Sequence, residues 1–187
     1  FCNLNELNAS ACVTKHGKFS EEKFYDLCRK SAILGTLQAG YTDFPYLGKQ
    51  TEEIVAGEAL IGISITGWMT RPELFDETIL RKGAEIVKKT NKEVARLIGI
   101  NPAARTTTVK PSGNASVILK TASGIHPEHS KRYFRIMQLN KESETAKYLM
   151  EHYPEMLEES LWSNTQSDWV VYVPCENHDN VIIKDDM

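Results

Sequence analysis

The segment Thr106–Leu119 constrains the fold of this chain more than any other. It begins with a β-branched run, Thr106–Val109, passes through the turn formers Pro111–Gly113 and continues into small and apolar residues, Asn114–Leu119. β-branched residues favour strands, and the sequence Pro-Ser-Gly favours a sharp turn. The segment therefore predicts a strand, a turn and a short helix. At such a junction the first backbone N–H groups of the helix have no partner within the helix.

This junction has two interpretations. In the first it is a phosphate cradle, because unpaired N–H groups and the helix dipole attract an anion and Gly113 provides a positive φ or clearance. Ser112, Asn114 and Ser116 would then add side-chain donors. In the second it is an ordinary helix start, capped by Ser112 or Asn114. Strand–loop–helix junctions are common, so the local pattern by itself favours the second interpretation.

Three stretches in a fixed order carry a family resemblance. Phe1–Asn8 begins Phe-Cys-Asn-Leu, Ile61–Gly67 ends Ser-Ile-Thr-Gly, and Thr108–Leu119 contains Lys-Pro-Ser-Gly-Asn-Ala-Ser and runs on into Thr121–Ser130. Together they resemble the large catalytic chain of ribonucleotide reductases. The likeness is closest to the adenosylcobalamin-dependent (class II) branch, whose chains typically carry Lys-Pro-Ser-Gly-Thr-x-Ser here. Asn114 stands where Thr is usual.

The resemblance implies a fold. The catalytic chain of the family is a ten-stranded α/β barrel made of two half-barrels, with the radical cysteine on a central finger loop. Residues 1–187 would be a single segment of the second half, without the upstream finger loop and the N-terminal half-barrel. The sequence pattern agrees with an α/β class, since strands are predicted near 1–10, 61–65 and 105–109, with helices between them.

The resemblance also implies an activity, the reduction of ribonucleotides to deoxyribonucleotides for DNA replication. In the family a thiyl radical abstracts the ribose 3′ hydrogen, water leaves the 2′ carbon and a cysteine pair supplies two electrons. Cys2 matches one member of that pair, although most free cysteines are simply buried small hydrophobes. The residues that match the phosphate loop are Pro111, Ser112, Gly113, Asn114, Ala115 and Ser116.

The implied cofactor is adenosylcobalamin, for which the sequence offers no binding residue. The implied partners are the remainder of the reductase chain, a ribonucleotide di- or triphosphate, and a thioredoxin- or glutaredoxin-type protein or another dithiol. Without the finger loop and the second redox cysteine, the polypeptide is expected to be inactive alone. It would be a split or intein-interrupted piece, or an excised segment. The alternative from another class is a stand-alone phosphate- or nucleotide-binding module without redox activity.

Composition limits the other possibilities. Hydrophobic residues make up 41% of the chain and charged residues 25%, and the net charge is −3, which is typical of a soluble globular protein without a basic nucleic-acid surface. No apolar run is long enough to cross a membrane, and the N-terminus shows no leader. The four cysteines form no C-x-x-C pair, which disfavours structural zinc. Their even number would allow two disulfides, but nothing else in the sequence is typical of a small secreted scaffold, so a reducing, cytoplasmic compartment is expected.

The remaining pattern predicts further elements. A helix is expected over 20–39, with Ser20 as its N-cap and Gly40 as a left-handed C-cap. Its apolar stripe, including Cys28, should face the core. Other expected elements are a short helix over 51–60, a helix capped by Thr70 from Pro72 to about 98, a strand at Arg132–Gln138, helices at 142–152 and Pro154–Leu161, and a strand at Trp169–Pro174.

A metal site at His126 and His129 is disfavoured, because Pro127 interrupts any helix between them and the sequence offers no third ligand.

Overall fold

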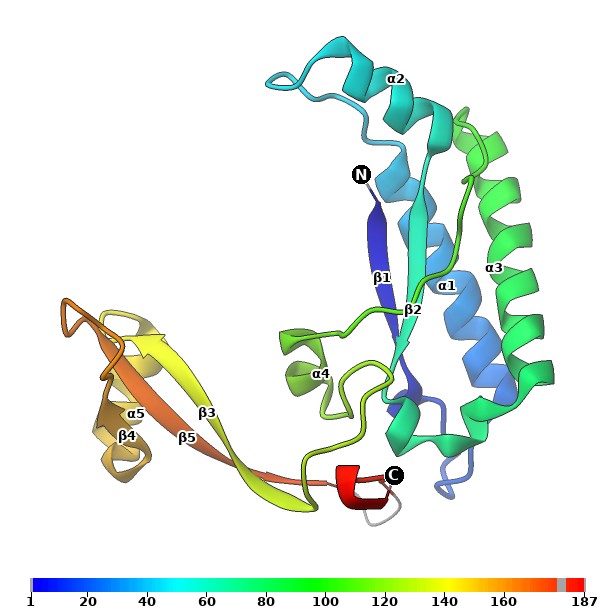
Figure 1. Cartoon of the computed structure of the whole chain (residues 1–187). Helices are drawn as coiled ribbons and strands as arrows, with labels where there is room; N and C mark the ends of the chain where they lie inside the picture. Colours follow the sequence, from blue (N-terminus) through cyan, green and yellow to red (C-terminus); the bar gives the residue numbers. More distant parts are fainter. Residues whose placement is uncertain (1, 178–180, 187) are drawn as a thin grey trace. The chain divides into compact units, whose positions relative to one another are not determined.

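A computed structural model describes residues 2–177 and 181–186 of the chain, which divides into two compact units (Figure 1). The first unit is Phe1–Glu128 together with Asn180–Met187, and the second is His129–Asp179. The first contains the junction Thr106–Leu119 and Cys2, so every candidate site residue lies in it.

A small parallel sheet forms the centre of the first unit. Strand β1 (Asn3–Asn8) pairs in parallel with β2 (Ile61–Thr66), and both strands lie where the sequence predicts a strand. The chain at residues 105–108 runs along the other side of β2, where the Ile61 N–H donates to the Arg105 carbonyl at 3.2 Å and the Thr108 N–H donates to the Ile63 carbonyl at 3.1 Å. The strand expected over 105–109 is therefore reduced to one isolated parallel bridge, between Ile63 and Thr107.

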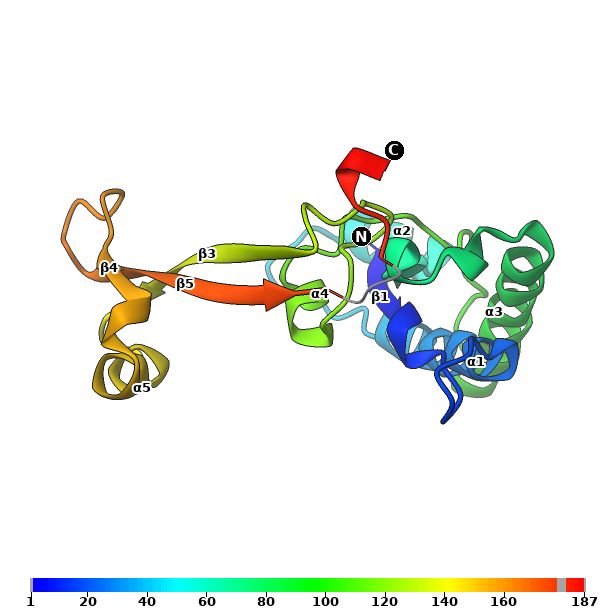
Figure 2. The same cartoon turned by 90° about the horizontal axis from the view of Figure 1, so that it is seen from below.

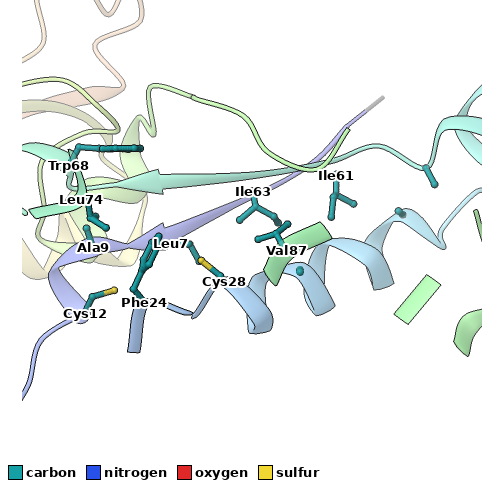
Figure 3. Packing of buried hydrophobic residues seen from close by; sticks show 13 residues of the cluster. Leu7, Ala9, Cys12, Phe24, Cys28, Ile61, Ile63, Trp68, Leu74 and Val87 are labelled. Atoms are coloured by element: carbon teal, nitrogen blue, oxygen red, sulfur yellow. The ribbon is translucent and has the colours of Figure 1, made fainter. Parts of the chain in front are cut away.

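Two long helices cover one face of this sheet. Figures 1 and 2 show α1 (Glu21–Ala39) and α3 (Glu77–Ile98) side by side along β1 and β2, while α2 (Lys49–Glu58) leads into β2. Ile61 and Ile63 pack against this layer, and Cys28 is part of the core as expected (Figure 3). Gly83 allows the two helices to approach closely, because a Cβ there would lie 2.9 Å from a ring carbon of Phe24.

The helix ends differ in part from the expectation. Ser20 caps α1 as predicted, since its hydroxyl accepts a hydrogen bond from the Lys23 N–H at 3.3 Å. The left-handed cap predicted at Gly40 is wrong, because this residue has a right-handed helical conformation with φ −72°. The helix start predicted at Thr70 and Pro72 is also wrong. These residues lie in two 3₁₀ turns, η2 (Trp68–Thr70) and η3 (Pro72–Phe75).

Asp76 sets the real start of α3. Its carboxylate accepts hydrogen bonds from the Thr78 and Ile79 N–H groups at 2.8 and 3.1 Å, as an N-cap aspartate does. The hydroxyl of Thr70 is used elsewhere, since it accepts a hydrogen bond from the Ala122 N–H at 3.1 Å. Gly99 ends α3 with φ +77°, which agrees with the helix end expected at about 98. Two further 3₁₀ turns are η1 (Ala9–Ala11) and η5 (Lys184–Asp186).

The second unit is an antiparallel sheet with one helix. Its strand order is β3 (Arg132–Asn140), β5 (Asp168–Glu176) and β4 (Leu157–Glu159), and α5 (Glu144–His152) follows β3. The two long strands and α5 confirm the sequence prediction. The helix predicted at Pro154–Leu161 is wrong. Only the 3₁₀ turn η4 (Pro154–Met156) forms, because the next three residues pair with β5.

The ten-stranded barrel is not present in the described residues, which form only these two small sheets. The predicted α/β class is confirmed, since the described residues form both helices and strands. None of the helices described is both long and apolar enough to span a bilayer.

Asn91 ties the two covering helices to the following loop. Its buried amide donates to the Thr36 hydroxyl at 2.9 Å and accepts from the Ala103 N–H at 2.9 Å. Because Asn91→Ala removes buried side-chain contacts and leaves the half-buried Ala103 N–H without its acceptor, we expect the free energy of unfolding to fall by about 2–4 kcal/mol. Urea denaturation measures this loss. The exposed neighbour variant Lys92→Ala should change it by less than about 0.5 kcal/mol, and an equal effect of both would contradict the account.

Candidate functional site

The predicted turn and short helix both form. The turn Lys110–Gly113 leads into α4 (Asn114–Leu119), a helix of 6 residues. Ser112 has φ +65°, and Gly113 has φ +55° and ψ −132°, a combination that only glycine adopts without strain. Gly113 occupies the N-cap position and no side chain caps the helix, so the expected cap at Ser112 or Asn114 is wrong. The side chain of Asn114 lies outside what the structure describes.

Two of the expected side-chain donors are engaged within the protein. The Ser116 hydroxyl donates to the Gly113 carbonyl at 2.8 Å, and the Ser112 hydroxyl donates to the carboxylate of Glu6. The Ser112 hydroxyl in turn accepts from that of Thr66 at 2.9 Å. A ligand at this turn would therefore meet chiefly the backbone N–H groups at the start of α4. Space is available beside Gly113, where a Cβ would have no neighbour within 4 Å.

The turn lies on the sheet face opposite α1 and α3, which we call the open face. The Lys110 N–H donates to the Ser64 hydroxyl at 3.3 Å. Gly62, on the same face, has no side chain, so Leu4, Thr108 and Cys2 can pack close to its backbone. A Cβ on Gly62 would lie 2.5 Å from Leu4 Cδ2 and 3.1 Å from Cys2 Sγ. The open face is made up of Cys2, Leu4, Glu6, Gly62, Ser64, Thr66, Thr108, Lys110 and Ser112.

Cys2 and the turn thus lie on the same face of the sheet, at different positions along β1. Cys2 precedes the strand, and the turn contacts Glu6, four residues further on. At roughly 3.3 Å per residue this places Cys2 about 13 Å from the contact at Glu6. Such a separation suits two different parts of one substrate better than two ligands of a single atom.

The cysteines differ sharply in their surroundings. Cys2 is exposed, so its interpretation as a buried small hydrophobe is wrong for this structure. Cys12 and Cys28 are buried in the core on the helix side. Burial raises the pKa of the Cys12 thiol to about 11 and that of Cys28 to about 12. Both stay protonated at neutral pH and are poor nucleophiles.

These thiols give a direct prediction. Iodoacetamide at neutral pH should modify Cys2 in the folded protein and spare Cys12 and Cys28 until the chain unfolds.

The two buried thiols also make the stability depend on pH. Folding raises the pKa of Cys12 and Cys28 from 9.0. Their contribution to the free energy of unfolding is therefore present below pH 9 and lost as pH rises through about 11 and 12. Peptide mass mapping measures the first effect and alkaline unfolding the second. Modification of Cys28 at the rate of Cys2 would contradict the structure.

A second set of contacts holds the turn from the following loop. The Ser123 hydroxyl donates to the Pro111 carbonyl, and the Gly124 N–H donates to the Thr66 hydroxyl at 3.0 Å. A Cβ on Gly124 would lie 2.4 Å from the Lys110 carbonyl oxygen, so only glycine fits there. Motif reasoning assigned no role to Glu6, Thr66 or Gly124. The period-2 alternation of β1, which places Glu6 on the face of Cys2, is the signal that could have found Glu6.

His126 and His129 do not belong to a cluster of metal ligands among the described residues. His126 Nδ1 lies 3.0 Å from the Ser123 carbonyl, and the ring of His129 packs edge-on against Tyr133 in the second unit. Among residues 2–177 and 181–186, no group of three His, Cys, Asp or Glu side chains is placed to hold a metal ion.

The fold of this chain is similar to part of a solved ribonucleotide reductase chain. The crystal structure of a B-12 dependent (class II) ribonucleotide reductase matches 97% of this chain with a TM-score of 0.68 and 17% sequence identity. This chain spans 28% of the length of that one. No family model and no curated protein matches the sequence. At this identity the likeness establishes the fold.

Proposed function

We propose that this chain is part of a ribonucleotide reductase and contributes a portion of its catalytic barrel. The observation that carries the proposal is the fold, which follows a class II reductase over 97% of the chain. The order of the three sequence motifs supports it independently, since Asn3–Asn8, Ile61–Gly67 and Thr108–Leu119 come together around one small sheet.

The turn is proposed to bind the substrate phosphates. The residues assigned to it are Pro111–Ser116. The main donors would be the backbone N–H groups at the start of α4, since the Ser112 and Ser116 hydroxyls and the Gly113 N–H donate within the protein. The positive φ of Ser112 and Gly113 turns the chain sharply before α4. Successive N–H groups in such a turn form an anion-binding concavity.

Cys2 is proposed to supply electrons. Its thiol and a second thiol outside this chain would together give two electrons and two protons and become a disulfide. One proton would leave with the ribose 2′ hydroxyl as water, and the other proton and the two electrons would form the new C–H bond at the 2′ carbon. A dithiol reductant would then reduce the disulfide by thiol exchange. The exposure of Cys2 supports this role, because exchange requires access by a partner sulfur. The radical cysteine that starts the reaction would also lie outside this chain.

Adenosylcobalamin would generate the radical if the protein is of class II, and no site for it is identified among the described residues of this chain. A cavity of about 360 Å³ lined by Leu7, Phe24 and Val87 lies on the helix side of the sheet. Its lining is mainly apolar core side chains, together with Thr107, Thr108 and Val109, so it offers few polar groups to a cofactor. We therefore place the cofactor on other parts of the assembled enzyme and derive no step through it.

Exposed apolar surface supports the need for the remainder of a reductase chain. Within the described part of the protein, β1 pairs with β2 alone, which leaves its outer edge free to accept another strand. Large apolar side chains are exposed in both units, as expected when a barrel is incomplete. They include Leu97, Val109 and Ile118 in the first unit and Phe134, Ile136, Leu161 and Trp162 in the second.

Gly113→Val tests the phosphate role. Valine at φ +55° and ψ −132° is strained, so the turn must change shape and the N–H groups lose their common direction. We expect nucleotide binding by the assembled enzyme to weaken roughly tenfold or more. Isothermal titration with a ribonucleoside triphosphate measures this effect. Gly48→Val, at an open position with φ −68°, is the matched control. Equal affinity in both variants would remove the turn from the site.

A further inference from the structure

We propose that Glu6 is a positioning residue for the turn Lys110–Gly113, and that Lys110 holds this carboxylate instead of binding phosphate. This inference rests on the proposed phosphate role of the turn. It gives a role to Glu6 of β1 and to Lys110 of the turn, for which the sequence motif alone indicates no function.

Glu6 contacts the turn at two points. One carboxylate oxygen pairs with the Lys110 ammonium and the other accepts the Ser112 hydroxyl proton. These contacts join residues more than a hundred positions apart in the sequence. Two contacts from one rigid strand fix both the first residue of the turn and the residue with φ +65°, so Glu6 defines the turn as a unit.

Burial decides what Lys110 does. The Glu6 side chain is 7% exposed, while that of Lys110 is 28% exposed. If Lys110 moved to a phosphate, Glu6 would remain as a nearly buried carboxylate without its cation, and breaking such a pair is strongly unfavourable. Lys110 therefore stays with Glu6 when a ligand arrives. The phosphate is left to the backbone N–H groups that the pair keeps aligned.

The backbone of the turn needs this support. Ser112 lies in the left-handed region, which costs free energy for a residue with a Cβ and persists only when surrounding contacts impose it. Its hydroxyl meets Glu6 from β1 and Thr66 from β2. Thr66 also binds the Gly124 N–H at 3.0 Å and so remains occupied without Ser112. Glu6 is the charged contact and the stronger of the two.

The test compares Glu6→Ala and Glu6→Gln in the protein at its full natural length. The glutamine amide oxygen can still accept the Ser112 hydroxyl, whereas alanine cannot. Amide hydrogen exchange at Lys110 and Gly113, whose N–H groups donate to the Ser64 hydroxyl and the Pro111 carbonyl, should become roughly tenfold faster in Glu6→Ala and change less in Glu6→Gln. Leu4→Ala, on the same face of β1, is the matched control and should leave this exchange unchanged.

Nucleotide affinity gives a second readout. With the turn loosened, the KM for the nucleotide should rise about tenfold in Glu6→Ala while kcat at saturation stays the same, and Glu6→Gln should recover most of the loss. The double variant Glu6→Gln/Lys110→Met should bind nucleotide as Glu6→Gln does, because Lys110 is not a phosphate ligand. It also keeps the test valid if Glu6→Ala fails to fold.

The outcomes separate the two proposals. Unchanged exchange in Glu6→Ala, tighter nucleotide binding in Glu6→Gln, or a further loss in the double variant would overturn the positioning role. If the wild-type protein binds no nucleotide but Glu6→Ala still speeds exchange at the turn, the phosphate role fails while the structural hold of Glu6 on the turn stands.

Discussion

Replacing Cys2 by serine is expected to reduce sustained deoxyribonucleotide formation by the complete enzyme to the background rate. A serine hydroxyl cannot form a disulfide, so the pair can no longer deliver two electrons at each turnover. The Cys2 side chain is exposed. It precedes β1 and lies next to Gly62 of β2. A change of one atom there should leave the free energy of unfolding within about 0.5 kcal/mol of the wild type.

The experiment measures product over many turnovers with a dithiol reductant, alongside urea unfolding of the same preparation. Cys175→Ser, which changes a half-buried thiol in the second unit, is the control and should keep full activity. Sustained turnover by Cys2→Ser would remove Cys2 from the mechanism. Loss of activity together with loss of folding would mean that Cys2 is structural, contrary to its exposure.

Gly124→Ala is expected to have the largest effect on the turn. The new Cβ would lie 2.4 Å from the Lys110 carbonyl oxygen, a backbone atom that cannot rotate away, and φ is +57°. The Gly124 N–H also binds Thr66, so displacement of this residue disturbs β2 as well as the turn. We expect the free energy of unfolding to fall by about 2–4 kcal/mol, with weaker nucleotide binding.

A matched glycine-to-alanine variant at another position is expected to change the free energy of unfolding in the opposite direction. Gly57 lies in α2, exposed and with no atom near a prospective Cβ. Gly57→Ala should raise the free energy of unfolding by about 0.5–1 kcal/mol, because alanine favours helix more than glycine does. Chemical denaturation of both variants provides the test. If Gly124→Ala proves as stable as the wild type, the close packing of Gly124 against the turn is incorrect.

Local sequence patterns predicted the elements whose causes are local. Ser20 and the apolar stripe behind it specify α1, and the apolar run at Ile61–Ile65 specifies β2. The errors came where a distant partner decides the conformation. Thr70 resembles a helix cap but its hydroxyl accepts the N–H of Ala122, and the residues after Met156 become β4 because β5 offers them a partner.

The candidate site divides in the same way. The motif around Ser112 and Gly113 predicted the turn and the short helix, because proline, serine and glycine act on neighbouring peptide units. The sequence did not indicate that the hydroxyls of Ser112 and Ser116 would be used inside the protein, nor that Glu6 would hold the turn. These contacts depend on the parallel register of β1 and β2, which a single sequence does not specify.

The most direct test of the central claim is deoxyribonucleotide formation by this chain joined to the remainder of its polypeptide, with and without adenosylcobalamin. The account predicts product only when the cofactor is present, and loss of that product in Cys2→Ser. Absence of product under both conditions, from a folded protein that still binds ribonucleotide, would contradict it and favour a nucleotide-binding module without redox activity.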